Sequence, residues 1–156
     1  MLARWSDQEA NAFPIWLRHS RACANGKLSM KTTQLNHVAL HVADVQKSCA
    51  FYGEVMQLEP MPRPNFDFPG AWFRLGEDQE LHLIGERPEA VTGAESRGEH
   101  WALMIDDMDE WEDYFKSKGI DYVPRRTRPD GAFQIYVSDP DGHCLELCTV
   151  GGVADQ

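Results

Sequence analysis

The sequence has few basic residues for its acidity and no long apolar run. Its 156 residues include 15 Lys and Arg against 25 Asp and Glu, which gives a formal net charge of −10 at pH 7. This charge argues against nucleic acid or an anionic membrane as the main partner, because phosphate binding needs concentrated Lys and Arg. No run approaches the roughly 18 apolar residues of a membrane span. We therefore expect a soluble protein whose partner is a small molecule.

Cysteine is scarce, and the spacing of the cysteines does not indicate a metal site. Cys23, Cys49, Cys144 and Cys148 show neither zinc-knuckle nor C-x-x-C spacing. Hydrophobic residues make up 42% of the chain, which is enough for a packed core without disulfides. The cysteines are therefore interpreted as reduced thiols of a cytoplasmic protein.

The N-terminal part of the chain differs from the rest. Residues 1–34 show little periodicity and end in the polar run NGKLSMKTTQ. Acidic residues interrupt the arginines of this segment, and no continuous apolar stretch accompanies them, unlike in a targeting peptide. We expect an extension over 1–34, a single domain over 35–150 and a short tail over 151–156.

An internal repeat organises the expected domain. The stretch HVALHVADVQKSCAFY, which starts at His37, aligns with HWALMIDDMDEWEDYF, which starts at His100. In the same way LHLIG, which contains His82, aligns with LELCT, which contains Glu146. These two alignments within one chain indicate two half-length modules. They cover residues 35–86 and 98–150.

Each module has the same predicted order of elements. An alternating segment typical of a strand is followed by Asp44 or Asp107 at the position of an N-cap, and then by a helix of about twelve residues. Three further strand-like runs complete each module, near 57–62, 71–76 and 79–85 in the first and near 121–127, 132–138 and 143–149 in the second. The predicted fold class is α+β, with paired βαβββ modules.

Strand alternation places the histidines of the repeat. In the first strand Val38 and Leu40 point towards the helix of the module, while His37 points away from it. The same alternation puts His82, His100 and Glu146 on the faces of their strands that lie away from the helix. If the modules pack as pseudo-symmetric halves of a curved mixed sheet, these four side chains converge. Three imidazoles and one carboxylate then form a divalent-metal site.

The alternative for each of the four residues is structural. An isolated histidine in a strand is usually a core or rim residue with a hydrogen-bond partner. A carboxylate in the sequence LEL is costly to bury unless it is paired, so a salt bridge to an arginine is the alternative for Glu146. The repeat symmetry, which selects all four positions together, favours the metal site.

Further residues are candidates for substrate binding. His41 has no histidine counterpart in the second module, and it is either a pocket wall or a proton-transfer group. Phe66, Phe68 and Tyr136 form either the apolar wall of a substrate pocket, together with Trp72, or part of the core.

A basic island and two thiols have several interpretations. Arg125 stands with Arg126 and Arg128 in an acidic chain, and suits a substrate carboxylate, a partner subunit or a strand edge protected by charge. Cys144 and Cys148 flank Glu146 on its face of the strand. They are either soft ligands or small buried hydrophobic residues, of which we favour the second.

Three stretches resemble the vicinal oxygen chelate (VOC) superfamily. LNHVALHVADVQKSCAFY, RGEHWALMIDDM and SDPDGHCLEL look like its signatures, and the resemblance covers residues 34–150. It implies the glyoxalase/bleomycin resistance/dihydroxybiphenyl dioxygenase fold around a divalent metal (Zn, Ni, Co, Mn or Fe), commonly in a homodimer. By resemblance the metal ligands fall on the four positions that the repeat selects: His37, His82, His100 and Glu146.

The resemblance is greatest to glyoxalase I-like proteins, the lactoylglutathione lyase family. The stretch RPNFDFPGAWFRLGEDQELHLIGE carries it, and it implies a lyase or isomerase that moves a proton within a hemithioacetal-type thiol adduct, with Glu146 as ligand and base. The sequence departs from glyoxalase I at three positions. His82 replaces the usual carboxylate, His41 replaces a glutathione-binding arginine, and Glu86 replaces an asparagine.

Other members of the superfamily provide alternatives. His37, His100 and Glu146 also suit Fe(II) in an extradiol-type dioxygenase. A non-catalytic binding or resistance protein of the same fold is a further alternative, although such proteins typically lack a full ligand set. Fosfomycin transferases have a threonine where this chain has Ala39.

Overall fold

Two copies of one strand and helix order make up the described part of the chain. The computed structural model describes residues 32–87 and 98–151. Both modules belong to one compact unit, Leu35–Gln156. Most of the expected extension and tail, together with Cys23, lies outside the described residues.

The first module contains four strands and one helix that widens at its end. Its elements are β1 (His37–His41), α2 (Val45–Ala50), the π-helical turn η3 (Phe51–Val55), β2 (Pro60–Met61), β3 (Gly70–Leu75) and β4 (Gln79–Ile84). The second module repeats this order with β5 (His100–Met104), α3 (Met108–Lys118), β6 (Val123–Thr127), β7 (Phe133–Ser138) and β8 (Cys144–Cys148).

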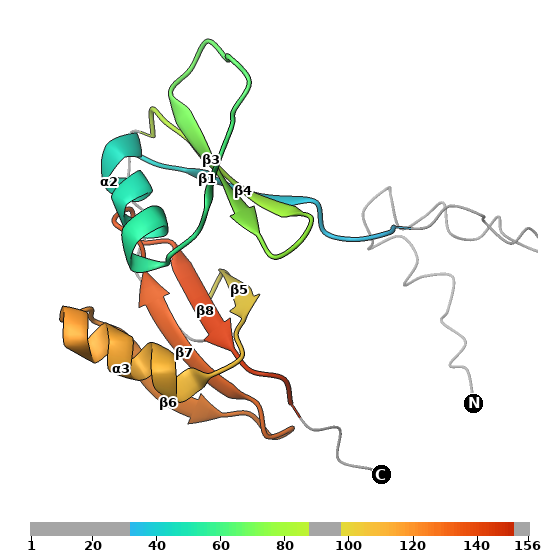
Figure 1. Cartoon of the computed structure of the whole chain (residues 1–156), viewed down its shortest axis with the longest axis vertical. Helices are drawn as coiled ribbons and strands as arrows, with labels where there is room; N and C mark the ends of the chain where they lie inside the picture. Colours follow the sequence, from blue (N-terminus) through green and yellow to red (C-terminus); the bar gives the residue numbers. More distant parts are fainter. Residues whose placement is uncertain (1–31, 88–97, 152–156) are drawn as a thin grey trace, which may run out of the picture. The chain divides into compact units, whose positions relative to one another are not determined.

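Each module forms one mixed four-stranded sheet (Figure 1). The strand orders are β1-β4-β3-β2 and β5-β8-β7-β6. In both sheets the first strand runs parallel to the last, and the other pairs are antiparallel. The equivalence of the two orders confirms the paired βαβββ fold that the repeat predicts.

The helices begin at the predicted caps. The Asp44 side chain accepts hydrogen bonds from the backbone N–H groups of Gln46 and Lys47, at 3.0 and 3.2 Å. Asp107 caps α3 in the same way. Gly119, with φ of 65°, ends α3 in the left-handed conformation that glycine adopts without strain.

Two elements of the first module differ from the sequence-based expectation. The helix after Asp44 is α-helical for six residues only and continues as the five-residue η3, in which Tyr52 is fully buried. The strand predicted near 57–62 is reduced to Pro60–Met61. Prolines at 60, 62 and 64 cannot donate hydrogen bonds to a neighbouring strand, which explains the short β2.

The predicted division of strand faces is confirmed in β1 and β4. Leu40, Leu81 and Leu83 are buried in the core that the helices cover, whereas His37 and His41 are exposed. The core is continuous between the modules. It includes Tyr52 and Phe73 from the first module and Phe115, Ile135, Leu145 and Leu147 from the second.

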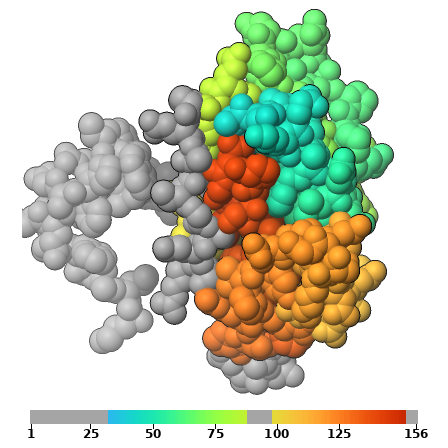
Figure 2. Space-filling view, turned by 90° about the vertical axis from the view of Figure 1, so that its left-hand side faces the viewer, coloured from blue at the N-terminus to red at the C-terminus, as the bar shows by residue number. Residues whose placement is uncertain are grey.

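A turn of the second module is anchored to the helix of the first by two buried carboxylates, Asp139 and Asp141. They are 5% and 4% exposed. Asp141 accepts a hydrogen bond from the Ala43 backbone N–H at 2.8 Å and one from the Ser48 hydroxyl at 3.3 Å. The Tyr52 hydroxyl donates to Asp139 at 2.8 Å. We call these contacts the carboxylate latch, and Figure 2 shows the blue-green surface of α2 against the red-orange surface of the second module.

The described residues contain neither a membrane-spanning helix nor a disulfide. No helix among residues 32–87 and 98–151 is long and apolar enough to cross a membrane. Cys49, Cys144 and Cys148 are free thiols. The cytoplasmic location inferred from the cysteines stays a prediction.

Replacing Tyr52 with phenylalanine tests the carboxylate latch. The Tyr52→Phe change removes a hydrogen bond to a buried carboxylate, and we expect the free energy of unfolding to fall by about 1.5–3 kcal/mol in urea denaturation. Tyr114→Phe is the matched control, because the Tyr114 hydroxyl donates to the Glu54 carbonyl oxygen in an exposed setting. There we expect a loss below about 1 kcal/mol. Equal losses in the two variants would contradict a special role for the latch.

Candidate functional site

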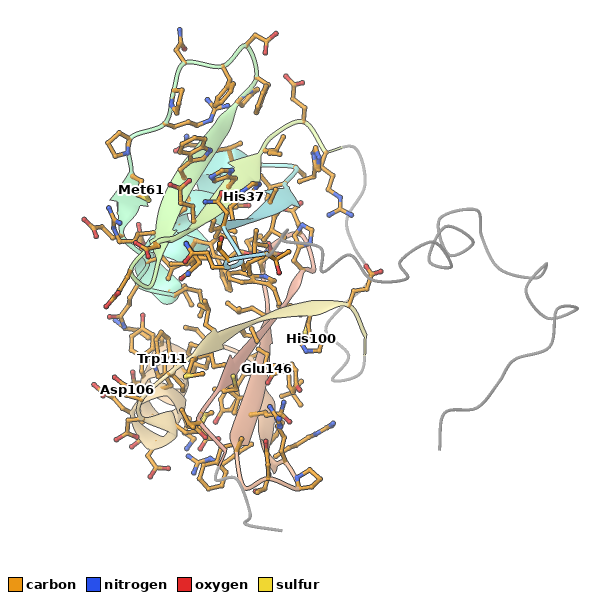
Figure 3. The ribbon with its side chains drawn as sticks, turned by 90° about the vertical axis from the view of Figure 1, so that its right-hand side faces the viewer. His37, Met61, His100, Asp106, Trp111 and Glu146 are labelled. Carbon is orange, nitrogen blue, oxygen red and sulfur yellow. The ribbon has the colours of Figure 1, made fainter. Side chains whose placement is uncertain are left out.

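His100 and Glu146 form a close pair on the second sheet. β5 runs parallel to β8 with Ala102 opposite Glu146, so His100 and Glu146 share the face that lies away from α3. His100 Nε2 lies 3.0 Å from Glu146 Oε2. Figure 3 labels both residues on the strands of the second module, and His37 on the strands of the first. The Glu146 residue is only 4% exposed, whereas the His100 side chain is 31% exposed.

A backbone carbonyl beside His100 orients its imidazole ring. His100 Nδ1 lies 2.8 Å from the Gly98 carbonyl oxygen, which can only accept a hydrogen bond. Nδ1 is therefore the donor to this oxygen, and Nε2 is the ring nitrogen that faces the carboxylate. A proton or a metal ion between Nε2 and Oε2 accounts for their short separation. The pair therefore fits a metal, because a metal-bound histidine typically donates its other ring N–H to an oxygen, as Nδ1 does here to the Gly98 carbonyl.

The other partners of Glu146 are neutral. Gln134 Nε2 donates to Glu146 Oε1 at 2.6 Å. Tyr136 donates a hydrogen bond to Glu146, and its ring meets the His100 ring edge-on at a centroid distance of 5.7 Å. Burial raises the pKa of Tyr136 to about 12, and the Glu146 hydrogen bond and charge act in the same direction. Tyr136 therefore stays protonated at neutral pH as a donor to the carboxylate.

The thiols on either side of Glu146 are also neutral. Burial, followed by the charge of Glu146, raises the pKa of both Cys144 and Cys148. Cys148 Sγ lies 3.6 Å from the Leu103 carbonyl oxygen. Protonated thiols are poor metal ligands, so this environment favours the interpretation as small hydrophobic residues.

The first sheet carries a stack of three flat rings on the corresponding face. The His82 ring lies between His37, at a centroid distance of 4.5 Å, and Trp72, at 4.2 Å. The stack follows from the strand register, because Ala39 and Trp72 are the neighbours of His82 on the two adjacent strands.

Both histidines of this stack have one nitrogen engaged. His37 Nδ1 lies 2.8 Å from the Asn36 side-chain oxygen, which leaves Nε2 available. His82 Nε2 lies 2.7 Å from Glu80 Oε2, which leaves Nδ1 available. Glu80 is not among the site residues that the sequence predicts. It stands two residues before His82 in the same strand, so strand alternation alone places its carboxylate on the same face.

The structure brings the four predicted ligands together in two pairs. One is the first-module pair, His37 with His82, and the other is the second-module pair, His100 with Glu146. Among residues 32–87 and 98–151 of a single chain, no group of three or more His, Cys, Asp or Glu side chains could hold a metal ion. One chain therefore presents the candidate ligands as two separate pairs, each of them a candidate half-site.

Aromatic residues continue the ring stack into the loop between β2 and β3. The Phe66 ring lies 6.1 Å from Trp72 and 5.2 Å from Phe68. Phe66 is 43% exposed, so it is available to a ligand. In the second module an open cavity of about 550 Å³ is lined by Tyr136, Val137, Ser138 and residues 120–124.

Two other predicted substrate-binding residues have different surroundings. His41 is exposed at the end of β1, where its carbonyl oxygen lies 3.2 Å from Arg87 Nη1 and 2.9 Å from His143 Nε2. Arg125 pairs with Asp109 and, at 2.6 Å, with Glu112 on α3. Because two carboxylates compensate its charge, these contacts favour the charged strand edge over a substrate contact.

Comparison with known proteins places these features in a family. Residues 34–147 match the model of the Glyoxalase/Bleomycin resistance protein/Dioxygenase superfamily. The chain is 32% identical to Glyoxylase I 4 of Arabidopsis thaliana, over 74% of this chain and 70% of the relative. It is 30% identical to the metallothiol transferase FosB of Bacillus licheniformis, over 81% and 80% of the two chains.

A solved structure shows the same fold. The crystal structure of a glyoxalase family protein from Bacillus anthracis superposes with a TM-score of 0.67 at 27% identity, and the match covers 77% of this chain and 97% of that chain.

The raised pKa of Tyr136 predicts a pH dependence of stability. The folded-state pKa of about 12 lies above the ordinary value of about 10, so the folded state holds the proton more tightly. The resulting contribution of Tyr136 to the free energy of unfolding is present below pH 10 and is lost as the pH rises towards 12. We expect the Tyr136→Phe variant to lose less stability than the wild type over that interval, by on the order of 2 kcal/mol. Urea denaturation at a series of pH values measures the difference, and parallel curves would contradict it.

Proposed function

Because the chain belongs to the Glyoxalase/Bleomycin resistance protein/Dioxygenase superfamily, we propose that it is a divalent-metal-dependent enzyme, a lyase or isomerase of the glyoxalase I type. The observation that carries the proposal is the His100–Glu146 pair, whose Nε2 and Oε2 atoms lie 3.0 Å apart while Nδ1 is held by Gly98. A buried carboxylate and an oriented imidazole are the ligand types that catalytic divalent metals use. Zn, Ni, Co, Mn and Fe all suit such a set.

We place the complete metal site between two copies of the chain. The first-module pair of one copy faces the second-module pair of the other, so that a homodimer holds two equivalent sites. The partial exposure of the His100 side chain and the exposure of the His37 residue support this arrangement, because both are accessible to a second copy. The exposed Met104, 70% accessible at the end of β5, provides apolar surface beside the half-site for the contact.

The residues of the half-sites have distinct roles in the proposed reaction. A bound metal would supply Lewis-acid stabilisation of two adjacent substrate oxygens. Glu146 removes the proton from the hemithioacetal carbon, which carries the sulfur, and delivers it to the neighbouring carbonyl carbon. A hydroxyl proton passes between the two oxygens. The ketone thereby becomes an alcohol and the hemithioacetal carbon becomes a thioester, with no net gain or loss of electrons. Tyr136 and Gln134 hold Glu146 in place by donating hydrogen bonds to it.

The substrate is proposed to be a small thiol adduct. The name of the relative FosB, a metallothiol transferase, supports a thiol in the chemistry of this family branch. It also makes metal-dependent thiol transfer the second candidate function. Ala39 stands where the fosfomycin transferases have a threonine, which favours isomerisation over transfer. His41 stands where glyoxalase I has a glutathione-binding arginine, which argues against glutathione as the thiol.

Metal content after dialysis tests the ligand assignment. We expect purified wild-type protein to retain about one Zn, Ni, Co, Mn or Fe per chain, measured by elemental analysis. The changes His37→Ala, His100→Ala and Glu146→Ala each remove a proposed ligand and should abolish stoichiometric metal. Glu80→Gln alters only the group that orients His82, so we expect about 10- to 100-fold weaker metal binding. His41→Ala is the matched histidine control and should keep the metal.

Activity assays then distinguish the candidate reactions. Hemithioacetals formed from methylglyoxal and a thiol test isomerisation, and oxygen uptake with catechols tests the dioxygenase alternative. A wild-type protein without stoichiometric metal would exclude the enzymatic proposals. Bound Fe(II) with oxygen consumption would replace the isomerase by the dioxygenase.

Mixing two inactive variants tests whether the site lies between copies. One variant carries His37→Ala with His82→Ala, and the other carries His100→Ala with Glu146→Ala. In a mixed dimer one site combines the two intact pairs, so subunit exchange at equal concentrations should restore about a quarter of the wild-type metal and activity. Two variants with the same pair removed are the control and should restore none. If the unlike mixture also restores none, the sites do not form between copies.

A further inference from the structure

Arg63, in the loop between β2 and β3, is fixed between two aromatic rings. Its Cζ atom lies 4.7 Å from the centroid of Phe66 and 4.8 Å from that of Phe68. Its Nη2 donates to the Phe68 carbonyl oxygen at 2.9 Å. Prolines at 62, 64 and 69 restrict the backbone of the same loop, so the guanidinium is held in one orientation before any ligand arrives.

The positive charge of Arg63 is not compensated within the described residues. An arginine stays charged at all accessible pH values. Arg74, Arg125 and Arg128 each pair with carboxylates, whereas no carboxylate of residues 32–87 or 98–151 pairs with Arg63. Its Nε is buried without a hydrogen-bond partner, and its Nη2 donates to the Phe68 carbonyl oxygen. A guanidinium that is held in place without a carboxylate partner suits the binding of an anion.

Arg63 lies on the same face of the first sheet as the stacked rings. Gly70 and Trp72 are opposite Ile84 and His82 on β4, and therefore share the face of His82. A Cβ atom at Gly70 would come within 3.2 Å of Arg63 Nε, so the guanidinium lies directly over this glycine. From there the rings of Phe66 and Trp72 lead to His82 and the first-module pair.

We propose that Arg63 binds a carboxylate of the substrate. The rings of Phe66 and Trp72 form a row, with Arg63 at one end and the first-module pair at the other. This inference rests on the proposed function, because it assigns the metal-chelating oxygens to one end of the substrate and the carboxylate to the other. The flat apolar surface of Phe66 and Trp72 accommodates the segment between them. A singly charged anion fits best, because Asp67 is the other charged residue of the loop and no second cation is available there for a phosphate.

Two matched probes test the assignment on metal-free protein by calorimetric titration. Phenylacetate and phenylacetamide have the same ring and nearly the same size, and differ in charge. We expect wild-type protein to bind phenylacetate at least about tenfold more tightly than phenylacetamide, because hydrogen bonds to a charged acceptor are the stronger ones. Arg63→Met should abolish the preference, and Arg63→Lys should retain part of it. Arg74→Met removes an equal charge from the same sheet and should keep the full preference.

Several outcomes would overturn this inference. Equal binding of the two probes by wild-type protein, binding of neither, or an unchanged preference in Arg63→Met would leave Arg63 with a structural role in the loop only. If Arg63→Met does not fold, judged by near-ultraviolet circular dichroism, the wild-type comparison and Arg63→Lys still decide. Metal content is measured separately. Protein that binds metal without preferring phenylacetate refutes the Arg63 assignment alone, and protein with the preference but no metal refutes the proposed function alone.

Discussion

The burial of Glu146 is the constraint on which the candidate site depends. A carboxylate in the middle of a strand loses its hydration and must be compensated by neighbouring groups. Gln134 and Tyr136 supply hydrogen bonds, and they come from β7, the strand adjacent to β8 in the sheet. These neutral donors hold the carboxylate in place and contribute no positive charge. Its oxygen Oε2 faces His100, an arrangement that suits a metal ligand and a base.

The β7–β8 hairpin also determines how the two modules are joined. β7 ends at Ser138 and β8 begins at Cys144, and the turn between them carries Asp139 and Asp141. These carboxylates accept hydrogen bonds from α2 and η3 of the first module, including that of Tyr52. One hairpin thus fixes both the carboxylate of the half-site and the contact between the modules. A displacement of the turn would move Glu146 and the second sheet together.

The sequence predicts the repeated part of the molecule well, because repetition and strand alternation are local signals. The N-caps Asp44 and Asp107, the strand faces around His37 and the paired βαβββ order all follow from short stretches of residues. The His37–His82 and His100–Glu146 pairs are also foreseeable in this way, since each lies on one face of neighbouring strands. The proposed combination of both pairs in one metal site involves a second copy of the chain, which strand alternation does not describe.

Features that depend on contacts between distant residues are not predictable in this way. The hydrogen bond between Tyr52 and Asp139 joins residues 87 positions apart, and no local sequence pattern predicts it. The aspartates appear in the sequence only as parts of a turn. The π-helical turn η3 carries this contact, since its Tyr52 is buried in the core and reaches Asp139. The sequence pattern predicts a helix over this segment but not its change of helical type.

The two modules share a backbone plan but have diverged in the chemistry of their exposed faces. The second sheet gathers a buried carboxylate and neutral hydrogen-bond donors, which suit proton transfer. The first sheet presents flat rings that end at the uncompensated cation Arg63, which suit recognition of an anionic ligand. The groups that suit an anionic ligand and the groups that suit proton transfer therefore lie on different sheets of the chain, Arg63 beside the first sheet and Glu146 on the second.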